Sequence, residues 1–256
     1  MNEKYVLICP DSLEGILAGV YEGWRYGNGG AQVELCTRPP SQTELFAHYR
    51  NVDPDQEKAE KVIRTIKREL GEESYEQICY AACSEDREKG TCIYYAIRKG
   101  LSCGRSRPAV LEDLKDPYIL KLSKLRLTVW HEMHRMLGFV RFREIQGKVL
   151  LAVIRPDNAV LPLLAPHFAD RLPREDWIIY DEGRQDALIH PVGRSCTIRR
   201  QAELDSGQVR ESGGDRVYAA LWKIFCQSIS VTERENLRVQ RQNLPYKYRR
   251  YMTEFW

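Results

Sequence analysis

The chain has 256 residues, 43% of them hydrophobic, which is enough to bury a core and excludes a disordered tail. Its 39 basic and 36 acidic side chains leave a net charge of only +3, so bulk charge does not indicate a nucleic-acid partner. The start of the chain lacks a signal-peptide pattern, and no apolar run approaches the roughly 20 residues that span a bilayer, so we expect a cytoplasmic protein without membrane contact.

The first part of the chain, residues 1–110, is predicted to open with a strand, a tight turn and a helix. An apolar β-type run over residues 5–9 is followed by a Pro-Asp-Ser turn, and apolar residues then recur at helical spacing from Leu13 to Trp24. Further elements are predicted as a strand over residues 31–35 and a helical insertion with helices over residues 53–70, 75–82 and 88–101. Residues 102–110, with a glycine and a proline, form the best internal boundary.

The eight cysteines are expected to be free thiols, because a cytoplasmic protein is kept reduced. Four of them follow the spacing C-x3-C-x8-C-x10-C from Cys79 to Cys103, which could suggest a metal cluster. The tight C-x2-C pair typical of such sites is missing, so we expect small buried apolar side chains and predict no cofactor.

The second part, residues 111–230, predicts alternating helices and hairpins. A helix after Pro117 ends at Gly138, and strands over residues 139–145 and 148–154 flank a Gln-Gly turn. The pattern then repeats as a helix over residues 160–172 and strands over residues 177–181 and 187–189. The order helix–hairpin–helix–hairpin predicts an α+β fold with one four-stranded antiparallel sheet and both helices on one face. A last helix over residues 215–229 leads to a tail, residues 231–256.

The sequence WHEMHR, residues 130–135, superficially resembles a zinc site. Metalloprotease helices carry H-E-x-x-H, whereas the spacing here is H-E-x-H, so we predict no metal. His131 and His134 could still share an ion with His167, although a hydrogen-bonded histidine is the commoner case. If the chain is an enzyme, we expect a pocket in which carboxylates and imidazoles converge, formed by Glu132, His134, His167 and Asp181.

Arginines after the WHEMHR helix suggest a cationic surface. Arg141 and Arg143 are two residues apart and would share one strand face, while Phe142 points to the other. With Arg135 they could contact phosphates, if the helices cover the Phe142 side. A solvated strand face paired with acidic residues is the alternative.

The tail holds the whole net charge, with six basic residues against three acidic ones. Basic and aromatic residues alternate in it, a pattern suited to phosphates and stacked bases: Lys247, Tyr248, Arg249, Arg250 and Tyr251. We expect replacement of both tail arginines to lower the salt dependence of DNA binding. The alternative is a tail that packs against its own domain or against a protein partner.

Three motifs in the middle of the chain are long enough to be specific: ExHRxxGFxRF over residues 132–142, LPLLAPHFADR over residues 161–171 and WIIYDE over residues 177–182. With DSLEGIL near the start and PYKYRRYMTEF near the end, they resemble a bacterial family of DNA metabolism proteins. The opening turn departs from that family, which has Asp-Gly-Ser where this chain has Pro-Asp-Ser.

The resemblance implies a DNA context and partnership with a radical-SAM protein of DNA modification or repair. In some lineages of the family a uracil-DNA glycosylase-like domain is fused behind the same module. Arg171, at the end of the second motif, joins the predicted DNA-contacting residues. Two hypotheses follow: an accessory protein that binds single-stranded or distorted DNA, or an enzyme that acts on damaged or modified nucleobases through Glu132, His134 and His167.

Overall fold

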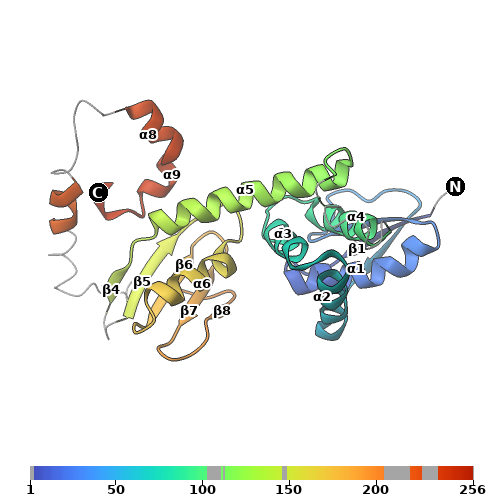
Figure 1. Ribbon diagram of the computed structural model, residues 1–256, viewed down its shortest axis with the longest axis horizontal. Helices are drawn as coiled ribbons and strands as arrows, with labels where there is room; N and C mark the ends of the chain where they lie inside the picture. The colour runs from blue at the N-terminus through green and yellow to red at the C-terminus, as the bar shows by residue number, and fades with distance from the viewer. Residues whose placement is uncertain are drawn as a thin grey trace. The chain divides into compact units, whose positions relative to one another are not determined.

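The computed structural model describes residues 3–102, 111, 113–145, 149–204, 220–226 and 236–255. It divides into two compact units, Met1–His131 and Glu132–Trp256, and the division falls inside one long helix, α5 (Pro117–Phe139). Helices and strands occur in both units, which confirms the predicted mixture of α and β structure (Figure 1). Most of the boundary predicted at residues 102–110 lies outside the described residues. No helix in the described ranges is both long and apolar enough to cross a membrane.

The first unit is built on three parallel strands in the order β2-β1-β3. Its elements are β1 (Lys4–Ile8), α1 (Leu13–Asn28), β2 (Gln32–Cys36), β3 (Ala47–Asn51), α2 (Gln56–Leu70), α3 (Glu72–Ala82) and α4 (Lys89–Ser102). The predicted strand–turn–helix opening is confirmed, and the Ser12 side chain caps α1 by accepting a hydrogen bond from the Gly15 amide at 3.0 Å. The described cysteines are free thiols.

The core of the first unit lies between the sheet and its helices. Leu7, Val33 and Leu35 are buried on one face of the sheet together with apolar residues of α1 and α4. The backbones of α4 and β2 approach closely, since a Cβ added at Gly90 would lie 2.6 Å from the carbonyl oxygen of Leu35. The Leu35 amide also donates to the Thr91 hydroxyl at 3.0 Å. A glycine is therefore required at this crossing.

The second unit contains a five-stranded sheet in the order β4-β5-β6-β7-β8. Its strands are β4 (Arg143–Ile145), β5 (Val149–Ile154), β6 (Trp177–Asp181), β7 (Asp186–His190) and β8 (Thr197–Arg199). Its helical elements include α6 (Leu161–Arg171), α8 (Leu237–Asn243), α9 (Tyr246–Arg249) and a 3-10 turn, η3 (Thr253–Phe255). Residues 220–226 are helical too, inside the predicted helix over residues 215–229, whose remaining residues lie outside the described part.

The prediction of one wholly antiparallel sheet is wrong at its centre. Both predicted strand pairs, β4–β5 and β6–β7, are antiparallel, but β5 and β6 pair in parallel. The reason is the connection between them, because α6 carries the chain back along the sheet and returns it to the end where β5 began. The helix α5 ends at Phe139, one residue past its predicted end at Gly138. The predicted Gln146-Gly147 turn lies outside the described residues.

The helix α6 covers the face of the sheet that carries Trp177 and Ile179, both fully buried. The ring of Phe142 meets Phe168 of α6 edge-on at 5.4 Å and Trp177 at 6.1 Å. Phe142 thus packs on the side of the sheet that α6 covers, which is the condition under which the arginines were expected to form a cationic surface. The opposite face buries Leu151, Tyr180 and Ala187 beneath the segment after β8.

The crossing of α4 and β2 generates a stability prediction. Replacing Gly90 with alanine should destabilise the protein by about 1–3 kcal/mol, because the new methyl group would collide with the backbone of Leu35. Urea unfolding followed by circular dichroism measures this change. Gly138→Ala is the control, since its added methyl group meets no atom within 4 Å and should be neutral or slightly stabilising. An unchanged midpoint for Gly90→Ala would contradict the close packing.

Candidate nucleic-acid interface

The second unit contains a cavity of about 890 Å³ that we call the arginine groove. Its wall is formed by the end of α5, the strands β4 and β5, the end of α6 and the helical residues 220–226. Charged and aromatic side chains that line it are Arg141, Arg143, Arg171, Phe142, Phe168, Trp222 and Phe225. The Arg141 and Arg143 pair and Arg171, which the sequence singled out from another motif, therefore line the same groove as four aromatic rings.

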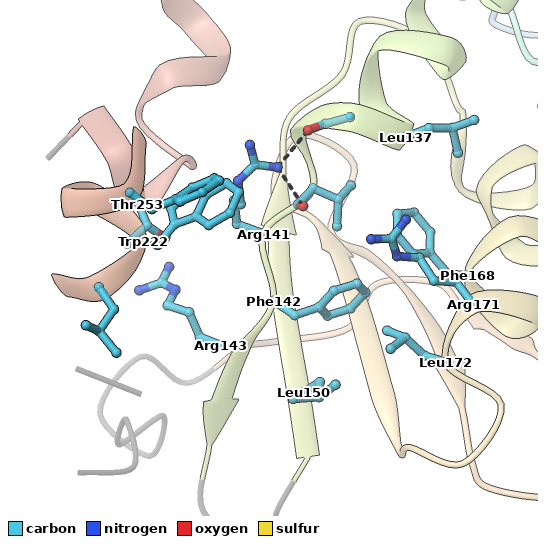
Figure 2. Close-up of a pocket in the computed structure, with 14 residues that line it drawn as sticks. Leu137, Arg141, Phe142, Arg143, Leu150, Phe168, Arg171, Leu172, Trp222 and Thr253 are labelled. Carbon is cyan, nitrogen blue, oxygen red and sulfur yellow. Dashed lines mark hydrogen bonds between the residues drawn. The ribbon is translucent and has the colours of Figure 1, made fainter. Parts of the chain in front are cut away.

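Figure 2 shows how these side chains are arranged. Phe142 and Leu150 lie between two sides of the groove, with Trp222 and Arg143 toward one side and Phe168 and Arg171 toward the other. The apolar packing of Phe142 on α6 fixes the strand β4 against this helix. The guanidinium groups consequently stand at the borders of an apolar surface, an arrangement suited to a ligand with both charged and flat apolar parts.

Arg141 lies between α5 and β4, so the prediction that it shares a strand face with Arg143 is wrong: the helix extends through Phe139 and the strand starts only at Arg143. One terminal nitrogen of Arg141 donates to the carbonyl oxygens of Gly138 at 2.6 Å and Val140 at 3.2 Å, at the carboxyl end of α5 (Figure 2). Its Nε and the other terminal nitrogen donate to the Glu254 carboxylate at 3.3 and 2.6 Å. The guanidinium also lies 5.7 Å from the centre of the Trp222 ring. A positive charge at the carboxyl end of a helix is favourable, so this position holds the arginine firmly.

The other predicted phosphate contacts differ in their surroundings. Arg143 opens β4 and is half-buried, whereas Arg171 ends α6 and is exposed. Arg135 is exposed on α5. Sequence reasoning did not identify Trp222 and Phe225, which are 40% and 49% exposed with ring centres 5.6 Å apart. The sequence did contain a signal for them. The predicted helix over residues 215–229 carries large apolar residues on every side, whereas a helix that packs on a core needs only one apolar face.

The basic tail packs against its own unit, which was one of the alternatives left open. Lys247 forms an ion pair with Asp157, and Arg250 forms one with Glu182 at 2.6 Å. The Tyr251 hydroxyl donates to the same Glu182 carboxylate at 2.5 Å. The Arg249 guanidinium lies over the rings of Tyr246 and Phe255, and Tyr248 is buried. These side chains are therefore already engaged in holding the tail in place.

Glu132 is the buried centre of these contacts. Its carboxylate accepts hydrogen bonds from the Asp157 amide at 2.7 Å, from the Asn158 amide at 2.8 Å and from the Asn158 side chain at 2.7 Å. The Tyr248 hydroxyl donates a fourth hydrogen bond at 2.6 Å. Burial, together with this hydrogen bond to Glu132, raises the pKa of the hydroxyl above its ordinary value. A carboxylate with four donors anchors structure, because its lone pairs are largely occupied.

Asp181, the other predicted catalytic carboxylate, is also buried and engaged. It accepts from the Gly183 amide at 2.9 Å, the Arg184 amide at 3.2 Å and the Arg184 guanidinium at 3.2 Å, which fixes the turn between β6 and β7. Burial raises the pKa of Asp181, although Arg184 opposes this shift. His134 is exposed on α5, and His167 packs edge-on against Phe168. Catalysis by these four residues stays a prediction.

Across the described ranges, no group of three or more histidine, cysteine or acidic side chains has a geometry that could hold a metal ion. His131, His134 and His167 are among these described residues.

The chain matches the family model DUF4130, a domain of unknown function, over residues 87–254. Because the match covers more than half of the 256 residues, the chain belongs to this family. The matched region includes the arginine groove, Glu132 and the tail through Glu254. A search of curated proteins finds no match to the chain.

The Glu132 contacts generate a second stability prediction. Tyr248→Phe should destabilise the protein by about 1.5–3 kcal/mol, because it removes a hydrogen bond to a buried charged acceptor. Tyr246→Phe is the matched control, because Tyr246 is exposed and the phenylalanine would keep the ring that contacts Arg249. Thermal unfolding by circular dichroism compares the two variants. Equal midpoints would show that the contact with Glu132 contributes nothing measurable.

Proposed function

We propose that the protein is a DNA-binding accessory protein of DNA repair or modification that holds single-stranded or distorted DNA in the arginine groove. The observation that carries this proposal is the convergence of Arg141, Arg143 and Arg171 around exposed aromatic rings. Guanidinium groups bind phosphates through paired hydrogen bonds, and aromatic rings stack on bases regardless of sequence. A duplex keeps its bases stacked inside, so the aromatic part of the groove favours unpaired bases.

The size of the groove fits this ligand. A cavity of about 890 Å³ lies within the usual range for sites that bury a small organic molecule, and one or two nucleotides are of that size. Three cationic side chains spaced around an apolar surface can neutralise phosphates while bases contact the rings.

A radical-SAM protein is the second partner that we propose. Support comes from the motifs over residues 132–142, 161–171 and 177–182, which resemble those of DNA metabolism proteins that work beside such an enzyme. In this proposal the accessory protein positions a DNA strand and the partner performs the chemistry.

An enzyme that acts on nucleobases through Glu132, His134 and His167 is the weaker candidate. A general base must reach the proton that it removes, and the oxygens of Glu132 are already occupied by amide and hydroxyl donors. The test is whether the protein releases bases from DNA and whether Glu132→Gln abolishes that release. If it does, and the variant unfolds at the wild-type midpoint, the enzyme becomes the stronger candidate.

Salt titrations test which basic residues contact DNA. Replacing Arg143 and Arg171 with glutamine should reduce the slope of log affinity against log salt by about 1.4, since each single-strand phosphate contact contributes roughly 0.7. The matched tail pair, Arg249→Gln with Arg250→Gln, should change the slope less because Arg250 is paired with Glu182 and Arg249 covers two rings. Fluorescence anisotropy with a labelled oligonucleotide supplies the affinities.

A larger change for the tail pair than for the groove pair would refute the groove as the main contact and favour the tail. No affinity of the wild-type chain at low salt would refute direct DNA binding. If a complex with a radical-SAM protein then bound DNA, only the accessory role would survive.

A further inference from the structure

The carboxylate of Glu254 occupies a three-donor site beside the arginine groove. It accepts hydrogen bonds from Arg141 Nε at 3.3 Å, from an Arg141 terminal nitrogen at 2.6 Å and from Trp222 Nε1 at 3.2 Å. The Glu254 side chain is only 12% exposed, and that of Arg141 only 23%. Arg141 and Trp222 both line the groove, as does Thr253, the neighbour of Glu254.

We infer that Arg141 and Trp222 form the phosphodiester-binding subsite of the groove, and that Glu254 is a built-in competitor that fills this subsite when no DNA is bound. This inference rests on the proposed function, because it names one phosphate position and its regulation within the same groove.

The chemistry of the occupant supports the assignment. A carboxylate presents one negative charge and two oxygens, and the phosphodiester of a nucleic-acid strand also presents one charge and two unesterified oxygens. The planar fork of an arginine matches both anions with two parallel hydrogen bonds. The Trp222 indole adds a donor to one of the same oxygens that Arg141 contacts. A site that fits the Glu254 carboxylate therefore also fits a phosphodiester.

The subsite would keep its shape after Glu254 leaves. The terminal nitrogen of Arg141 that does not contact Glu254 donates to the Gly138 carbonyl oxygen at 2.6 Å. The end of α5 therefore orients the guanidinium independently of Glu254. The Trp222 ring lies 5.7 Å from the same guanidinium. Only the edge of Arg141 that faces Glu254 has to exchange partners. A preoriented arginine loses less entropy when an anion binds.

Glu254 can leave without unfolding its surroundings. It lies in the three-residue turn η3, while the segment before it is anchored by the buried side chains of Tyr248 and Met252. Burial alone would raise the pKa of Glu254, but the hydrogen bonds from Arg141 and Trp222 outweigh it and hold the pKa below the ordinary value. Glu254 is thus ionised at neutral pH and competes with a phosphate as an anion.

The test measures binding of a fluorescein-labelled 15-nucleotide oligothymidylate by anisotropy at low salt. Glu254→Gln should bind about three- to tenfold more tightly than wild type, since the loss of one partly buried ion pair frees that much affinity. Glu254→Ala, which also removes the acceptor, should bind at least as tightly. Circular dichroism checks that both variants retain the wild-type fold.

Two further variants separate this mechanism from a general gain of positive charge. Glu203→Gln removes the same charge from an exposed side chain of the same unit and should leave the affinity within about twofold of wild type. In the background of Arg141→Gln, the change Glu254→Gln should give no gain, because no arginine remains to be released.

The outcomes distinguish the two proposals. If wild type binds with the salt dependence expected of the groove but Glu254→Gln binds equally, the competitor is refuted and the groove stands. A gain that persists without Arg141, or that Glu203→Gln reproduces, also refutes the inference. If neither wild type nor any Glu254 variant binds, the proposed function and the inference fall together.

Discussion

Four hydrogen bonds to the carboxylate of Glu132 join three segments of the second unit that are far apart in the sequence. Glu132 itself belongs to α5, its amide donors follow β5, and the Tyr248 hydroxyl comes from α9. A buried carboxylate without donors would cost several kcal/mol, so these segments are required to meet there. The position of the tail depends on this contact, and Glu254, six residues after Tyr248, reaches Arg141 because of it.

The parallel pairing of β5 and β6 explains which acidic residues pair with two basic side chains of the tail. Parallel strands end at the same edge of a sheet, and here Asp157 and Glu182 follow those two ends. Lys247 and Arg250 are paired with these acids. Leu150, near the opposite end of β5, lines the arginine groove. Two of the six basic residues of the tail therefore help to dock it on its own unit, and the arginines that line the groove lie outside the tail.

The elements that local patterns predicted well are those with strong periodicity or caps, such as α1 after Ser12 and β6. The strands β3 and β8 were missed because both lie at sheet edges and are largely exposed, so neither shows the apolar alternation of a half-buried strand. The parallel pairing of β5 with β6 depends on where α6 returns the chain, which no local pattern encodes. The sequence singled out the three arginines and Phe142 but not Trp222 or Phe225, because the groove joins residues as far apart in the chain as Leu137 and Thr253.

Arg141 carries two roles that would conflict in most arginines. As a helix-terminal cation it is bound to carbonyl oxygens of α5, and as a groove residue it has to present hydrogen-bond donors to an anion. The five N–H groups of a guanidinium resolve this conflict, because one nitrogen can remain on the helix while the opposite edge binds the Glu254 carboxylate or, as we propose, a phosphodiester. Lysine, a point charge on a flexible stem, could not hold both sets of partners in fixed directions. The geometry at Arg141 thus links the end of α5, the tail and the groove through a single planar group.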